Sequence, residues 1–185
     1  MNLQLLSGTA AAIVFGSILT PGLAEESAFN RYTAEATLAM HKHDYDACEK
    51  ACIKAVNEAE KYPRSRKIAT SLSNLAHLYR LQGKVNLAVS TAEKALRAAQ
   101  DSIDPVEIAV CDNNLGKMYA MENRYKEAEP LLKSSVDILK DKPDQKAALM
   151  FCMENYADLL KATNRKAESD KMEASAKAIR DKLKR

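Results

Sequence analysis

The chain repeats its own pattern about every forty residues, and this period restricts the fold more than any other feature. Three ten-residue stretches, 74–83, 114–123 and 155–164, align without gaps at spacings of 40 and 41 residues. Each stretch begins with Asn, a large apolar residue and a small residue, and each ends with Gly or Asn. Periods of this length are typical of repeat proteins, in which each unit buries its apolar face by stacking on the next.

Apolar residues recur at helical spacing on both sides of a turn, so each repeat is predicted to be a helical hairpin. Gly and Asn suit the turn because they tolerate the left-handed conformation that ends a helix. A weaker copy upstream keeps the register, which gives four hairpins. The turn residues are His43, Gly83, Asn123 and Asn164. The expected helices span residues 27–42, 45–61, 65–82, 85–100, 105–121, 125–140, 144–162 and 165–183.

Small residues mark the seam of each hairpin, because antiparallel helices approach to about 8–10 Å only where side chains are short. The predicted seam pairs are Ala76 with Ala88, Gly116 with Ala128, and Ala157 with Ser169. After residue 24 the chain keeps two glycines, too few for a β-rich fold with many tight turns. The fold class is therefore predicted to be all-α, an α-solenoid of four hairpins. Pro130 is expected to bend the sixth helix, since it removes one backbone hydrogen bond.

Three segments resemble the tetratricopeptide repeat (TPR) in its longer, kinesin-light-chain-like form: residues 68–76, 108–116 and 124–132. The resemblance covers about residues 30–183. It divides the domain at 25–185 into repeats at about 29–62, 68–101, 108–141 and 149–183. Asp112 departs from the pattern, because the family prefers an apolar residue there, and this leaves the local packing in question.

The resemblance implies a non-enzymatic protein–protein interaction module whose first helices line a concave groove for an extended peptide. It also implies that Asn74, Asn114 and Asn155 point into that groove. A carboxamide both donates and accepts hydrogen bonds, so three of them in phase could bind the main chain of a ligand without selecting its sequence. The alternative is that each Asn is only a polar residue beside a helix–helix seam.

Side chains one turn further along are expected to share the concave face. They combine basic and apolar groups, which suits a peptide with a carboxylate and an apolar anchor, whereas the alternative is a solvated helix face. The further candidates are His77, Arg80, Leu81, Asn113, Lys117, Met121, Phe151, Asp158 and Lys161.

The first 24 residues contain no Asp, Glu, Lys or Arg. An apolar stretch over residues 3–19 is followed by Thr20-Pro21-Gly22, which is expected to interrupt any helix, and by small residues before Glu25. This pattern predicts a secretory signal peptide cleaved after Ala24, and hence export to the periplasm or the cell exterior. The segment has no basic residue at its start, so an uncleaved membrane anchor and a soluble apolar helix remain as alternatives.

The four cysteines are predicted to be buried thiols. Cys111 and Cys152 occupy equivalent positions in adjacent repeats, where helices about 10 Å apart exceed the roughly 7 Å limit for a disulfide. Cys48 and Cys52 stand one helical turn apart, where the other repeats have Ala or Leu. The alternatives are a Cys48–Cys52 disulfide and a metal or redox role.

His41 and His43 form an H-x-H pair, but residues two apart on a helix face different ways, and no further ligand spacing completes a metal site. A turn and capping role, with Asp44 as the N-cap, is favoured over a metal site.

The final helix is predicted to cap the solenoid, with an apolar stripe at Met172, Ala176, Ile179 and Leu183 and charge on its other faces. Residues 161–185 carry nine Lys or Arg and four Asp or Glu. A solvated cap explains these charges, and contact with anionic lipid or an acidic partner is the alternative.

No catalytic, phosphate-binding or cofactor motif is present, so no enzymatic activity and no cofactor are expected. The net charge of +3 indicates no nucleic-acid surface. The sequence thus predicts an exported adaptor or scaffold that binds a protein or peptide. The alternatives are a structural, self-associating protein and an adaptor tethered to a membrane by its N-terminal segment. The oligomeric state is left open.

Overall fold

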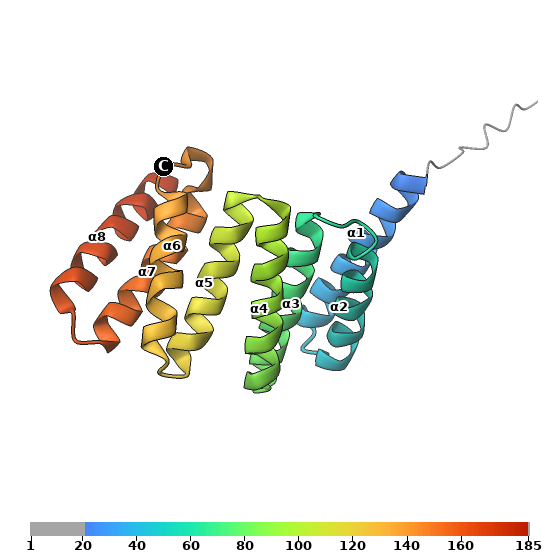
Figure 1. The fold of residues 1–185 in the computed structure, drawn as a ribbon, viewed down its shortest axis with the longest axis horizontal. Helices are drawn as coiled ribbons and strands as arrows, with labels where there is room; N and C mark the ends of the chain where they lie inside the picture. The colour runs from blue at the N-terminus through green and yellow to red at the C-terminus, as the bar shows by residue number, and fades with distance from the viewer. Residues whose placement is uncertain (1–20, 185) are drawn as a thin grey trace, which may run out of the picture.

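The structure is a computed structural model that describes residues 21–184 as eight α-helices and one short 3-10 helix, arranged in four consecutive hairpins (Figure 1). The elements are α1 Pro21–His41, α2 Tyr45–Ala59, α3 Arg66–Leu81, α4 Val85–Ser102, α5 Pro105–Met121, α6 Tyr125–Leu139, η1 Pro143–Gln145, α7 Lys146–Ala162 and α8 Lys166–Leu183. None of the described helices is both long enough and apolar enough to cross a membrane.

The predicted helices are confirmed, with most ends within two residues of the expected ones. The start of α1 is the exception, because the helix begins at Pro21 and includes Gly22. The helix thus starts earlier than predicted, whereas the predicted interruption of the apolar stretch at Thr20-Pro21-Gly22 concerns residues outside the described ones and stays a prediction. Proline is accepted in the first turn of a helix, where a backbone N–H has no partner to lose. The signal-peptide prediction falls mainly on residues 1–20, which lie outside the described residues.

All four hairpins turn in the same way. The turn residues His43, Gly83, Asn123 and Asn164 have φ angles of 57°, 72°, 58° and 61°. After each of them, the next backbone N–H donates to the carbonyl oxygen five residues earlier at 2.8–3.0 Å: residue 44 to 39, 84 to 79, 124 to 119 and 165 to 160. This closure at a left-handed residue confirms the predicted turns.

Short side chains do hold the helices of each hairpin together. At Gly116, an added Cβ would lie 2.8 Å from Cγ of Leu132 and 3.2 Å from the carbonyl oxygen of Ala128. In the last hairpin, Oγ of Ser169 donates to the carbonyl oxygen of Ala157 at 2.9 Å. The seam leaves no room for longer side chains at these positions.

The hairpins stack through a layered apolar core. Each second helix packs on the next first helix, and α5 also contacts α3 and α7. One large cluster joins the second, third and fourth hairpins, with Leu132, Leu139, Leu159 and Leu160 fully buried. Burying one such leucine contributes about 1.5–3 kcal/mol. The stacking and the absence of strands within residues 21–184 make the fold an all-α solenoid, as predicted.

The first hairpin has a lighter core than the others. Its clusters consist mainly of alanines and of Cys48 and Cys52, joined by Leu75 and Leu78 of α3. Phe29, which is 8% exposed, is the one large side chain that α1 contributes to the buried core among the described side chains. Small side chains therefore make up most of the core of the first hairpin.

The terminal helix α8 packs as a cap, with Ala176 buried and with Met172 and Ile179 packed against the large cluster. Leu183 is 51% exposed, so the predicted apolar stripe is one residue shorter than expected. Leu183 is the last residue of α8. Helix α6 runs through Pro130, and the expected local bend stays a prediction.

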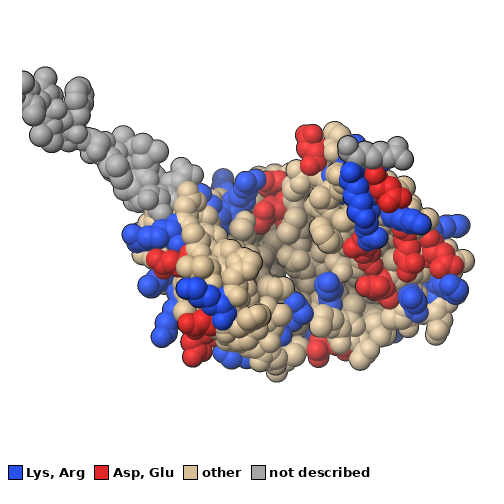
Figure 2. Space-filling view, turned by 180° about the vertical axis from the view of Figure 1, so that it is seen from behind, with Lys and Arg blue, Asp and Glu red and all other residues tan. Residues whose placement is uncertain are grey.

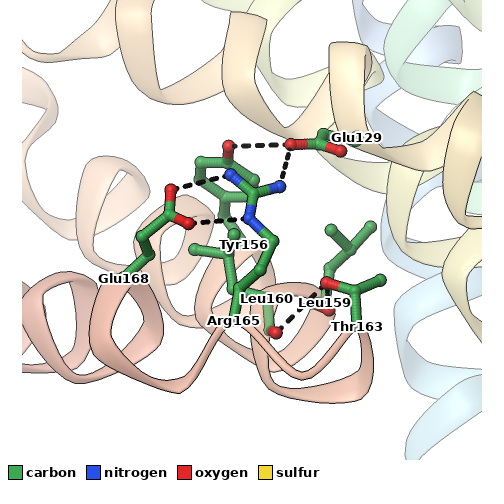
Figure 3. Close-up of polar contacts among 7 residues, drawn as sticks. All are labelled: Glu129, Tyr156, Leu159, Leu160, Thr163, Arg165 and Glu168. Atoms are coloured by element: carbon green, nitrogen blue, oxygen red, sulfur yellow. Dashed lines mark hydrogen bonds and ion pairs between the residues drawn. The ribbon is translucent and has the colours of Figure 1, made fainter.

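Charged side chains that follow the turns tie the second and fourth hairpins to the preceding ones, and in the second hairpin Nζ of Lys84 donates to Glu49 on α2 at 3.0 Å. Figure 3 shows Arg165, whose guanidinium binds both carboxylate oxygens of Glu168 at 2.7–2.8 Å and also binds Glu129 on α6. Oη of Tyr156 donates to the same Glu129 at 3.4 Å. Such exposed pairs each contribute about 0–1 kcal/mol, so they orient the hairpins more than they stabilise them.

Asp112 is accommodated in spite of its departure from the apolar pattern. Its side chain is 5% exposed, and its Oδ2 accepts a hydrogen bond from Oγ of Ser134 on α6 at 2.7 Å. Burial raises the pKa of the Asp112 carboxyl, and the Ser134 hydrogen bond opposes this rise. Asp112 thus forms a polar contact between α5 and α6. The equivalent residue of the preceding repeat is Leu72.

We predict that Gly116→Ala lowers the free energy of unfolding by roughly 1–3 kcal/mol, because the new methyl group collides with Leu132. This loss exceeds the gain of about 0.5–1 kcal/mol that alanine brings to a helix. Chemical denaturation followed by circular dichroism measures the effect.

Leu132→Ala supplies the control through a double-mutant cycle. It removes the atom nearest to the added methyl, so Gly116→Ala should cost much less in that background. A variant Gly116→Ala as stable as the wild type would contradict the steric account of the seam.

Candidate binding groove

A cavity of about 450 Å³ lies between the first helices α3, α5 and α7. Figure 2, which views the molecule from the side opposite to Figure 1, shows a hollow in the middle of the molecule with mostly uncharged walls. The structure brings eight of the predicted residues to the lining of this cavity: Asn74, His77, Arg80, Asn113, Asn114, Lys117, Phe151 and Asn155. We call this cavity the groove.

The three in-phase asparagines all line the groove, but they are not equivalent. Asn74 is exposed and Asn114 is half-buried, and their side chains make no hydrogen bond among the described residues. Asn155 instead donates from Nδ2 to Oδ1 of Asn113 at 2.9 Å, across α5 and α7. Two carboxamides are therefore open to a ligand, while the third joins two helices.

The middle of the groove is cationic. Nη2 of Arg80 donates to Nδ1 of His77 at 3.3 Å, because a guanidinium carries no acceptor. Burial lowers the pKa of the His77 imidazole, and the charges of Arg80 and Lys117 lower it further. Among residues 28–184, no carboxylate forms an ion pair with Arg80 or Lys117. The site thus presents two cations and a neutral imidazole, an arrangement that suits an anion.

The α7 end of the groove is apolar. The ring of Phe151 is 57% exposed and stands in the lining beside Val110, Met118 and Ala148. An exposed aromatic ring in the same cavity as two cations can hold an apolar side chain while the cations hold a nearby carboxylate.

The remaining predicted residues lie around the groove. Met121 and Asp158 line an adjoining cavity of about 220 Å³ that shares Lys117 and Asn155 with the groove. Lys161 and Leu81 are exposed and line neither cavity. Both stand at or near the end of their helices, beyond the part that faces the groove.

The groove also extends toward the first hairpin, which the sequence analysis did not predict. A cavity of about 180 Å³ shares Asn74 and His77 with the groove and is walled by α1 and α2, including Met40, Cys48 and Cys52. The repeat pattern did not indicate this extension, because the first repeat is divergent and α1 carries no Asn in register with Asn74.

All four cysteines are free and buried, as the prediction of buried thiols required. Burial raises the pKa of Cys52 to about 12 and that of Cys111 to about 12. A thiol with such a pKa is protonated at neutral pH and does not act as a nucleophile.

His41 ends α1 and His43 lies in the first turn, and Asp44 caps α2 by accepting from the backbone N of Ala47 at 3.0 Å. Within residues 28–184, no group of three or more His, Cys, Asp or Glu is placed to hold a metal ion.

Tetratricopeptide repeat profiles match residues 31–101 and residues 109–141 of the chain. No curated protein matches its sequence.

Solved structures match over most of the chain. The crystal structure of BtubC (BKLC) from P. vanneervenii superposes with a TM-score of 0.73 at 21% identity, covering 86% of this chain and 66% of that one. Two crystal structures of nearly identical TPR-like repeats, from a kinesin light chain candidate of Podosopora anserina, give TM-scores of 0.66 and 0.64. Both are 17% identical, and they cover 84% and 85% of this chain and 76% and 77% of their own. This likeness concerns the fold.

We predict that the His77 imidazole titrates below the ordinary value of about 6.5, because its burial and the two cations disfavour a further positive charge. An NMR titration of its ring protons measures the midpoint. Lys117→Gln should raise the midpoint, and a bound carboxylate should raise it more. A midpoint at or above the ordinary value would show that the middle of the groove is not cationic.

Proposed function

Because this chain belongs to the tetratricopeptide repeat family, we propose that its groove holds an extended segment of a partner protein. Such repeats typically bind protein partners, and they make the chain a protein–protein interaction or scaffold module. Proteins of this family are generally non-enzymatic scaffolds, and the absence of catalysis here stays a prediction.

One observation carries the proposal: the groove combines open carboxamides, unpaired cations and an exposed aromatic ring. Asn74 and Asn114 can bind the main chain of an extended segment, since each offers a donor and an acceptor. Arg80 and Lys117 select for a carboxylate in the segment. Phe151 selects for an apolar side chain next to it. The favoured ligand is therefore an extended peptide with an acidic group and an apolar anchor.

The proposal is tested by selecting peptides from a random library on the full chain and measuring their affinity by fluorescence anisotropy. The selected peptides should carry an acidic and an apolar residue. Lys117→Glu should weaken them by roughly tenfold or more, since a charge-assisted contact contributes about 1.5–3 kcal/mol. Asn74→Ala and Asn114→Ala should each weaken them by about two- to tenfold.

Lys161→Glu is the matched control, because it makes the same change of charge on an exposed residue outside the groove. It should leave the affinity nearly unchanged. Asn155→Ala is less suitable, since it also breaks the hydrogen bond to Asn113. Peptides that bind Lys117→Glu as tightly as the wild type would refute the groove as their site and favour a structural, self-associating role.

The proposal includes export. Residues 1–24 lack any charge and precede a polar start at Glu25, which supports removal as a signal peptide. We expect mass spectrometry of the protein purified from its native host to give an N-terminus at Glu25. A mature chain that retains residues 1–24 would instead indicate a membrane-tethered adaptor.

A further inference from the structure

A second cavity lies outside the groove, on the face formed by the second helices. It is an open space of about 1200 Å³ between α2 and α4, and α3 forms its floor. Figure 1 shows α2 and α4 on either side of α3. We call this space the outer cavity. It separates the first hairpin from the second, whereas the proposed function uses the layer of first helices.

The apolar character of the outer cavity belongs to this one joint and is not imposed by the repeat. Its walls and floor include Ile53 on α2, Leu72 on α3 and Leu87 on α4. Forty residues later, the positions in register at the next joint carry Glu93, Asp112 and Glu127. Leu72 packs against two buried clusters, which accounts for its apolar side chain. The solenoid tolerates acidic residues at the positions of Ile53 and Leu87, so packing alone does not explain these two.

Two of these side chains are open to solvent, since Ile53 is 41% exposed and Leu87 is 49% exposed. A third apolar residue, Ile103, stands at the rim with 80% of its surface exposed. Ile103 is also left-handed, with φ of 60°, at the C-cap of α4. A β-branched residue is strained in that conformation, and an exposed isoleucine gains nothing from burial. Both costs are explained if Ile103 contacts a partner.

The charges along the cavity define the chemistry of that partner. On α4, Lys94 and Arg97 line the wall, and neither forms an ion pair among residues 28–184. Arg64 stands at the rim, also without an ion pair among those residues. The acidic residues of the lining, Glu60 and Asp101, are fewer than these cations. The α4 side therefore favours carboxylates on whatever lies between the helices.

We propose that the outer cavity is a second docking site, which takes an amphipathic helix of a partner protein with acidic residues beside its apolar stripe. Leu87 lies near the start of α4 and Ile103 at its C-cap, about 24 Å apart along the helix axis. A partner helix of four to five turns, whose apolar stripe recurs every three or four residues, can follow both of them and Ile53 along the trough between α2 and α4. Its acidic edge lies against Lys94 and Arg97. The chain then holds two segments at once, one on each face of the solenoid.

The test uses three labelled helical peptides of about five turns. The first has a leucine stripe flanked by glutamates, the second has lysine in place of each glutamate, and the third has serine in place of each leucine. Fluorescence anisotropy with the full chain should show binding of the first peptide, weakened by added salt, and at least roughly tenfold weaker binding of the other two.

Variants at the cavity assign the site. Ile53→Glu and Leu87→Glu introduce the residues that the next joint carries, so the fold should persist, and each should weaken the first peptide about tenfold or more. Ile103→Asn should weaken binding while it relieves the left-handed strain and raises the melting temperature. That pair of effects cannot arise from unfolding.

Two controls separate this proposal from the groove. Lys133→Glu changes the position in register with Ile53 at the last joint, and Arg80→Glu changes the groove. Neither should alter the affinity for the first peptide. No binding of the first peptide, equal binding of the lysine peptide, or full affinity in Leu87→Glu would overturn the proposal. So would sedimentation showing a wild-type dimer that Leu87→Glu dissociates, since a second copy would then cover the cavity.

Discussion

A helical hairpin with alanine, glycine or serine along its seam cannot shield its own apolar side chains from water, and everything else in this structure depends on that constraint. The short residues let the two helices approach so closely that Gly116 has no room for a methyl group beside Leu132. Other large apolar side chains reach beyond the hairpin into the cluster shared by the second, third and fourth hairpins, so each hairpin needs a neighbour to cover them. Stacking is thus obligatory, and it arranges the first helices in one layer and the second helices in another. Both candidate binding surfaces are spaces between helices of one layer.

The features that the sequence predicted are those that repeat. Gly83, Asn123 and Asn164 recur at fixed spacing because each turn needs a residue that accepts a positive φ, and the four turns form as predicted. The candidate groove was largely assembled from the same register, since in-phase residues on stacked helices lie side by side. What the register could not supply is contact between residues out of phase. The bond from Asn155 to Asn113 joins different positions of neighbouring repeats, and the start of α1 depends on Pro21, which lies before the first repeat.

The outer cavity likewise could not be predicted from the repeat pattern alone. Each of Ile53, Leu72 and Leu87 looks like an ordinary apolar residue when its own helix is considered alone. Only the arrangement of three consecutive helices shows that they meet in one open space, beside a left-handed isoleucine. At the next joint, the positions of Ile53 and Leu87 carry Glu93 and Glu127. The fold therefore does not require an apolar residue at these two positions.

The composition of the core differs between the two ends of the solenoid. The second, third and fourth hairpins share one cluster rich in leucine, whereas the first is held mainly by alanines, cysteines and Phe29. Local opening requires the least free energy where the least apolar surface becomes exposed, so we expect the first hairpin to open before the other three. Both the extension of the groove beside Cys48 and the outer cavity lie against that first hairpin. A ligand bound in either cavity would stabilise the first hairpin against local opening. Ordering that hairpin would reduce the net free energy of binding.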